Sequence, residues 1–359
     1  MKITRSRVLV LSALALASAQ AFADGASVYA LLDGGVASAN VAGKSTTEFI
    51  TGGQVPNFVG VKFEKSEGGL KYGVQLEQGF QWSNPNGTSE KLFAFGNGDL
   101  LNRQKNIFIS GAAGTFVIGT QPNIAFNTVL MADPHGAANY GSSLTTITGK
   151  GSLSTVDNAS LSYTSPAMSG VTVSAQLVPV TTTTASTASS AQLKSGSRAA
   201  VAYTSGNLSL GLSAYSDQFN DTATGSYADG TGTVLGASYK LDNFTFKAIS
   251  ASQKTNTFTS ALTTNGIGGV YSLNDKVSFD LGVYSASSSI NSFKLDTTAV
   301  AGYYKLAKDL KVYAQYATVE NKGTITTDWN FLWQSVAPTT LDAGKKADVL
   351  NVGLIFSYF

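Results

Sequence analysis

Several residue types that support common protein chemistries are missing or scarce in this chain. There is no cysteine among the 359 residues, which excludes a disulfide framework, an iron–sulfur cluster and thiol catalysis. His135 is the only histidine, so a catalytic triad or a metal site would have to depend on this one imidazole. No stretch approaches about eighteen consecutive apolar residues, so no membrane-spanning helix is predicted.

Charge is scarce as well, at 13% of residues. The first 23 residues hold three of the 24 basic residues and none of the 22 acidic ones, so the rest of the chain has a net charge near −1. Nucleic acid is not a predicted partner, because such binding needs a basic stripe. A fibrous or low-complexity adhesin would also be rich in Gly, Ser and Thr, but an aromatic content of 10% favours ordered strands.

The first 23 residues resemble a secretory signal peptide. A basic start is followed by an apolar run at 8–19 and by the small-x-small motif Ala21-Phe22-Ala23. A transmembrane anchor is the alternative, but twelve apolar residues are too few to cross a bilayer. We therefore predict a signal peptide at 1–23, cleavage between Ala23 and Asp24, and a single mature domain at 24–359.

Strands are indicated by apolar and polar residues that alternate with a period of two. Residues 70–77, 277–284 and 310–317 each place apolar side chains on one face and polar or charged ones on the other. The last ten residues do the same, with one apolar row made of Leu350, Val352, Leu354, Phe356 and Tyr358. A soluble sandwich shows this alternation too, so the spacing of the connections must decide.

Short turns and long polar loops alternate along the chain. Seven short turns rich in Gly, Asn, Asp and Ser are predicted at 65–69, 111–114, 165–170, 205–207, 240–243, 273–276 and 306–309. Eight long loops are predicted at about 38–54, 83–99, 122–155, 181–196, 217–231, 254–265, 288–296 and 321–346. They join sixteen strands, with the short turns and both ends of the mature chain on one side. We predict an all-β, transmembrane, antiparallel β-barrel around an aqueous lumen.

Several phrases resemble the trimeric general porins of Gram-negative bacteria, especially the beta-proteobacterial branch. The most specific is Leu101-Asn102-Arg103-Gln104 followed by Gly114-Thr115-Phe116-Val117-Ile118-Gly119-Thr120-Gln121. The others lie at 27–36, 68–77, 158–166 and 310–316, in the order of the family, and together they cover essentially all of the mature chain.

The resemblance implies a homotrimer of sixteen-stranded barrels in the outer membrane, each an independent pore for passive diffusion of ions and small hydrophilic solutes. It implies membrane lipid, lipopolysaccharide and the barrel assembly machinery as partners, and no cofactor. A solute-specific porin is the alternative, and a surface receptor or adhesin displayed on a barrel is another. Catalysis and a metal site are not expected, because no nucleophile motif and no ligand cluster accompany His135.

In that family the third long loop folds inward and narrows the lumen. Here this loop is 122–155, the longest predicted connection, and it carries Asp133-Pro134-His135-Gly136. Acidic groups on the family's loop face basic residues on the wall, and the field between them selects ions. We therefore expect Asp133 and His135 at the constriction.

The basic wall departs from the family pattern. One family arginine is lost at Asn57 or Phe58, and Thr120 replaces another, whereas Arg103 is kept and Arg198 is the second arginine of the mature chain. The resemblance therefore suggests a wider or less charged constriction with weak ion selectivity.

Four basic residues are candidates for that wall: Arg103, Lys105, Lys62 and Lys71. Arg103 and Lys105 are two residues apart, so both are expected to point inward. Gln104 and Asn106 would then point toward lipid, unless a trimer contact shelters them or a bulge shifts the register. Each lysine could equally be an ordinary charge of a wet face or rim.

The final strand of the family closes the barrel against the first strand and is read by the assembly machinery. Its last aromatic residue normally ends the outward row. Here that row ends at Tyr358, and Phe359 follows one residue later. Either Tyr358 is the outward anchor, or a late twist turns Phe359 outward.

Overall fold

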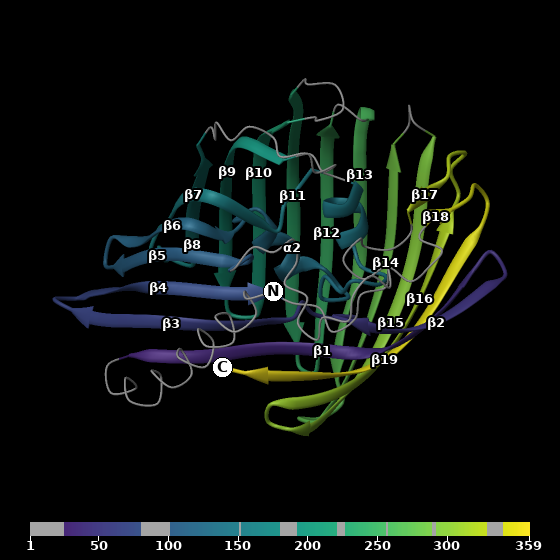
Figure 1. Cartoon of the computed structure of the whole chain (residues 1–359), viewed down its shortest axis with the longest axis horizontal. Coiled ribbons are helices and arrows are strands. Elements are labelled where there is room, and N and C mark those ends of the chain that lie inside the picture. Colours follow the sequence, from purple (N-terminus) through teal and green to yellow (C-terminus); the bar gives the residue numbers. More distant parts are fainter. Residues whose placement is uncertain are drawn as a thin grey trace, which may run out of the picture.

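The computed structural model describes residues 25–79, 101–150, 152–179, 192–220, 227–255, 258–288, 292–328 and 340–359. Within these residues 17 strands form one antiparallel sheet. Two of them, β2 and β3, pair with different halves of β1 and share one place beside it, which leaves sixteen strand positions in the ring. Figure 1 shows the strands curving into a barrel around the helix α2. The predicted all-β barrel of sixteen strands is confirmed.

The barrel strands follow one another in chain order. They are β1 (Ala26–Val41), β2 (Lys44–Thr51), β3 (Phe58–Glu67), β4 (Leu70–Gly79), β5 (Gln104–Gly111), β6 (Gly114–Pro122), β7 (Val156–Thr164), β8 (Val171–Val178), β9 (Gln192–Ser205), β10 (Leu208–Asn220), β11 (Tyr227–Leu241), β12 (Phe244–Thr255), β13 (Phe258–Ser272), β14 (Val277–Ser288), β15 (Phe293–Ala307), β16 (Leu310–Asn321) and β19 (Lys346–Tyr358). A small separate hairpin, β17 (Thr327–Asp328) with β18 (Thr340–Leu341), lies between β16 and β19. None of the helices in the described residues is long and apolar enough to cross a membrane.

The barrel closes where β1 pairs with β19, in register from Ala30 opposite Tyr358 to Val41 opposite Ala347. The apolar row of β19 points outward and ends at Tyr358, which is 53% exposed. The ring of Phe359 stacks on Tyr29, with 6.1 Å between centroids, and Tyr29 belongs to the inner face. The geometry therefore matches the first alternative, in which Tyr358 is the last outward aromatic residue.

All seven predicted short turns separate paired strands, but two of the predicted long loops were wrong. At 38–54, β1 and β2 instead form a hairpin whose turn is Ala42-Gly43, with φ angles of 51° and 89°. Such left-handed pairs match the twist of a two-residue hairpin. At 254–265, β12 and β13 extend almost to each other. One face of each hairpin is buried, at Ala37 and Ile50 and at Ala251 and Leu262, but the many Ser and Thr residues give the sequence the composition of a loop.

Other predicted features lie outside the described residues. The whole of the loop at 83–99 and most of the loop at 181–196 fall there, as do both sides of the cleavage site, Ala23 and Asp24. The signal peptide therefore stays a prediction. The loop at 122–155 is described except for residue 151, and it determines the shape of the lumen.

Candidate pore constriction

The connection between β6 and β7, called the inward loop (residues 123–155), folds into the barrel. It contains α2 (Phe126–Ala132) and a π-helix (Thr145–Lys150). Apolar side chains of the loop pack against the inner faces of β10, β11 and β12 in one buried cluster, which includes Val129, Ile147, Val234 and Ile249. Burial of each such side chain contributes about 1.5–3 kcal/mol. The hydrophobic effect therefore holds α2 flat against one side of the wall.

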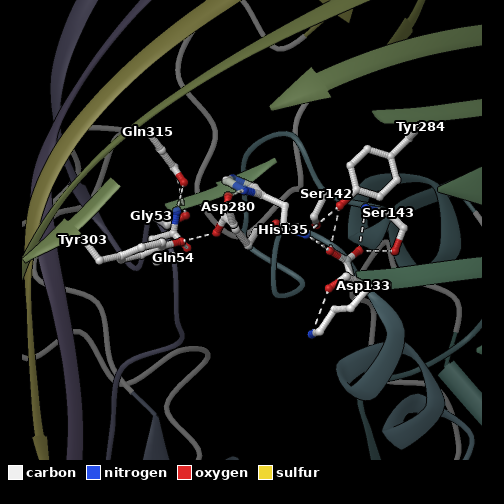
Figure 2. Close-up of polar contacts among 12 residues, drawn as sticks. Gly53, Gln54, Asp133, His135, Ser142, Ser143, Asp280, Tyr284, Tyr303 and Gln315 are labelled. Carbon is white, nitrogen blue, oxygen red and sulfur yellow. Dashed lines mark hydrogen bonds and ion pairs between the residues drawn. The ribbon is translucent and has the colours of Figure 1, made fainter. Parts of the chain in front are cut away.

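Asp133 ends α2 and attaches the loop to β14. Its carboxylate accepts hydrogen bonds from the Tyr284 hydroxyl, at 2.8 Å, and from the backbone N–H groups of His135 and Ser143 (Figure 2). The ammonium group of Lys247 donates to the Asp133 carbonyl oxygen at 3.1 Å. The Asp133 side chain is buried, so its charge is turned toward the wall and away from the water of the lumen.

His135 makes a second attachment to the same strand. Its Nδ1 atom lies 2.5 Å from Oδ1 of Asp280, and the imidazole is fully buried (Figure 2). The Tyr303 hydroxyl lies 2.7 Å from the other Asp280 oxygen and 2.9 Å from Oε1 of Gln54. The structure thus places Asp133 and His135 side by side as buried attachments of the loop to the wall.

Gln54 belongs to an inward bulge (residues 52–57) between β2 and β3, which the sequence analysis missed. Thr51 lies opposite Gly34 of β1 and Phe58 lies opposite Leu31, so six residues face only two. The bulge reaches the tip of the inward loop, where the Asn139 N–H donates to the Gly53 carbonyl at 3.2 Å. The Gly52-Gly53 pair and Pro56 were the available signal, because both residue types weaken strand pairing.

A buried carboxylate of β1 organises this bulge. Asp33 accepts hydrogen bonds from the N–H groups of Gln54 and Val55, at 2.7 and 2.9 Å, and from the Tyr313 hydroxyl of β16 at 2.8 Å. The Gln54 side chain in turn donates to Gln315 of β16. The bulge therefore joins β1, β16 and the inward loop.

The exposed residues of the inward loop are uncharged wherever their side chains are described. Among loop residues whose side chains are described, the exposed ones are Asn127, Leu130 and Gly136. Leu130 lies on α2 and is 49% exposed. Burial, together with the negative charges of Glu48 and Asp33, raises the pKa of the Tyr140 phenol above its ordinary value, so this group also stays neutral.

Two of the predicted wall lysines lie together on the inner faces of β3 and β4. Lys62 and Lys71 each place Nζ 2.7 Å from Glu64, which therefore pairs with both. The Lys62 ammonium also lies over the ring of Phe108, 4.9 Å from its centroid. With side-chain exposures of 34% and 52%, both lysines reach the water of the lumen.

Arg103 also lies on this wall, whereas Lys105 does not. Arg103 pairs with the buried Glu77 at 3.3 Å and lies over the ring of Phe58. Lys105 lies two residues from Ile107 in β5 and therefore on the same face, and Ile107 is 59% exposed on the outer face, so the expectation that Lys105 points inward was wrong. The reason is that β5 begins only at Gln104, after Leu101 adopts a positive φ of 60°. The regular alternation that the sequence analysis assumed therefore does not include Arg103.

Because the register is shifted, Gln104 and Asn106 point inward. Gln104 donates a hydrogen bond to Glu77, and Asn106 is 5% exposed. They therefore need no shelter from lipid. This outcome matches the alternative in which a local irregularity changes the register.

The base of the inward loop is fixed by a buried charge cluster that was not predicted. Arg198 of β9 pairs with Asp157 of β7 at 2.8 Å and with Asp217 of β10 at 2.5 Å, and all three side chains are fully buried. Asp157 also accepts from the hydroxyl of Ser154, a residue of the loop. The lone arginine in a strand rich in Ala and Ser was the only signal for this cluster.

Comparison with the sequence profiles of known protein families finds a match. The profile of the Gram-negative porin family matches residues 10–324. The chain belongs to this family. None of the curated protein sequences matches it.

Solved structures share the fold of this porin at low sequence identity. The anion-selective porin from Comamonas acidovorans is 20% identical with a TM-score of 0.78, over 93% of this chain and 99% of that one. The outer-membrane channel DcaP of Acinetobacter baumannii is 12% identical with a TM-score of 0.62, over 93% and 98%. The outer-membrane-expressed OmpT of Vibrio cholerae is 14% identical with a TM-score of 0.61, over 93% and 97%.

Family membership and the barrel together identify the porin as an outer-membrane channel for passive diffusion of solutes. The inward loop covers the inner wall from β10 to β12 and is attached to β14. On the wall of β3–β5, by contrast, Lys62, Lys71 and Arg103 remain accessible to water. In the described side chains, the passage therefore has a neutral side at the loop and a basic side at β3–β5.

Proposed function

We propose that this porin is a general diffusion channel for ions and small hydrophilic solutes with weak ion selectivity. The observation that carries the proposal is the complete burial of Asp133 and His135, which are 0% exposed. The exposed part of the loop is uncharged where it is described. With no exposed charge among the described side chains of the loop, a strong transverse field across the passage and strong selection by charge are not expected.

The remaining preference should be for anions, and it should be small. Lys62, Lys71 and Arg103 reach the lumen, but each pairs with Glu64 or Glu77. Opposite charges at these distances cancel much of each other's field. The Comamonas neighbour is described as anion-selective, so its ion preference has the same sign as the one proposed for this porin.

The test is the reversal potential of the purified protein in planar bilayers across a KCl gradient. We expect a small potential on the anion side. Replacing Glu64 with Gln (E64Q) should enlarge it, because Lys62 and Lys71 lose their shared partner. The control D296N removes a carboxylate that pairs with Lys322 on the outer face and should leave the potential unchanged. A strong preference of either sign in the unmodified protein would contradict the proposal.

The same preparation distinguishes the alternatives. A display barrel for an adhesin or receptor would show no large conductance steps, whereas an open trimer shows large steps in groups of three. A solute-specific porin would pass one class of solute much faster than others of equal size. Liposome swelling with neutral sugars and with organic acids measures that difference directly.

We also infer a homotrimer in contact with lipopolysaccharide and assembled by the barrel assembly machinery. The outward faces of β3, β5 and β19 carry exposed apolar side chains, among them Phe63, Ile107 and Leu354, as a lipid or subunit contact requires. One related structure, OmpT of Vibrio cholerae, is described in a trimer form. Analytical ultracentrifugation in detergent, with correction for bound detergent, measures the oligomeric state.

A further inference from the structure

A pair of lysines faces the lumen at the short-turn end of β15 and β16. Lys305 and Lys311 lie directly opposite each other in the strand register. The Lys311 ammonium lies over the ring of Tyr303, 5.2 Å from its centroid, and Tyr303 belongs to the inner face. Because cross-strand partners point to the same face, Lys305 points inward as well.

Lys276 extends this pair into a row of three, called the lysine row (Lys276, Lys305 and Lys311). The N–H of Lys305 donates to the Lys276 carbonyl oxygen at 2.9 Å, so Lys276 is the neighbour of Lys305 on the other side, where β14 begins. Lys276 and Lys305 are both exposed. The row therefore runs from the short turn before β14 to the adjacent strands β15 and β16.

The lysine row differs from the other lysines of the inner wall. Lys62 and Lys71 share Glu64, and Lys247 donates to a carbonyl oxygen. Within the described part of the chain, no carboxylate oxygen lies within 4.0 Å of an ammonium group of the row. The neighbouring buried acids, Asp33 and Asp280, are occupied by other donors.

Like charges directly opposite each other on one face of a sheet repel, because their Cβ atoms are only about 4.5–5.5 Å apart. A fixed carboxylate would normally relieve this repulsion. Among the described residues no fixed carboxylate pairs with the lysine row, so a mobile anion in the water of the lumen can take that place. An anion with two charges that can bridge adjacent ammonium groups is favoured over chloride, and lysine is a common phosphate ligand.

The row also lies apart from the constriction. Tyr303 and Tyr313, the next inward residues of the two strands, form the level at which the inward loop and the bulge are attached. Lys305 and Lys311 are one step closer to the short turn at 308–309. In a barrel of this layout the short turns face the periplasm.

We propose that the lysine row is a binding site for small multivalent oxyanions, of the phosphate type, on the periplasmic side of the constriction. The inference rests on the proposed open diffusion channel. An anion held there occupies the path of other ions. It should therefore reduce chloride current in a saturable way and more strongly when it enters from the short-turn side.

The test uses the full-length protein in planar bilayers in KCl, with inorganic phosphate added to one side at a time. We expect phosphate on the short-turn side to reduce chloride current. The variant K305Q/K311Q should need about tenfold more phosphate for the same reduction, equivalent to about 1.4 kcal/mol. The variant K305R/K311R keeps both charges and should retain the effect. The control K65Q/K308Q removes two charges at the same end of the barrel, from the outward face of β3 and from a turn, and should behave like the unmodified protein.

The outcomes separate the two proposals. If K305Q/K311Q conducts KCl normally and phosphate still acts on it as on K65Q/K308Q, the lysine row is not the site. If the unmodified protein conducts but phosphate has no effect from either side, the site does not exist. Failure of the unmodified protein to conduct KCl would instead contradict the channel function.

Discussion

His135 and Asp280 join the inward loop to β14 through a contact of 2.5 Å between Nδ1 and Oδ1. Only 0% and 5% of the two side chains are exposed. The adjacent attachment, from Asp133 to Tyr284, reaches the same strand four residues further along. The segment that follows α2 is therefore attached to β14 by two polar contacts, whereas α2 itself depends on apolar packing.

The substitution D280N should loosen the attachment of the segment around His135 to β14. Asn keeps the shape of Asp280 but has no negative charge, so the contacts with His135 and Tyr303 lose the carboxylate that they share, and hydrogen bonds to an uncharged amide are weaker. We expect noisier single-channel current and a higher mean conductance. The same chemical change on the outer face, D296N, is the control. Identical current traces for the two variants would show that the contact does not position the loop.

Gly141 permits the inward loop to cross the wall at close range. A Cβ atom there would lie 2.6 Å from the Cβ atoms of both Ala299 and Ala317, and its φ is +76°. G141A should therefore displace the loop and change the conductance. Gly136 has a similar φ of +69° but open space around it, so G136A carries only the backbone strain of about 1–3 kcal/mol. The difference between the two variants measures the steric contact alone, and equal conductances would contradict it.

Removing Arg198 should destabilise the barrel severely. R198M leaves Asp157 and Asp217 buried without their partner, which typically costs about 3–5 kcal/mol. The measurement is the temperature at which the folded protein loses its compact gel mobility. The combination R198M/D157N/D217N should recover part of the loss, because the uncompensated charges are gone. R103M, at the partly exposed pair with Glu77, should cost less.

At the closing strand, the substitution Y358A should reduce the yield of folded barrel more than deletion of Phe359. Tyr358 ends the outward row, opposite Ala30, whereas Phe359 only stacks on Tyr29 from the inner side. The measurement is the amount of heat-modifiable protein in outer membranes. A larger loss on deletion of Phe359 would mean that the assembly machinery reads the last residue whatever its direction.

The sequence predicted what depends on strand periodicity and failed where periodicity breaks. The alternation in 310–317 predicted the two faces of β16 correctly. Lys105 was misplaced because one residue with positive φ, Leu101, precedes β5 and separates Arg103 from its alternation. The bulge at 52–57 was missed for a related reason, since its six residues follow neither the period of a strand nor that of a helix.

The role of the candidate site residues depended on partners far away in the chain. Asp133 and His135 were found as members of the inward loop, but their burial comes from Tyr284 and Asp280, about 150 residues later. No local pattern records such a pairing. The sequence could therefore indicate which residues belong to the loop, but not that their polar groups face the wall.

The bulge at 52–57 has a consequence for how the channel is assembled. It is anchored on Asp33 of the first strand, on Gln315 near the end of the chain and on the tip of the inward loop. Contacts between such distant segments are slow to form, because the chain must first bring its ends together. An unfinished barrel therefore lacks the support for its own narrow passage. We expect the bore to reach its final width only when the first and last strands meet, so that an incompletely assembled channel leaks more than a complete one.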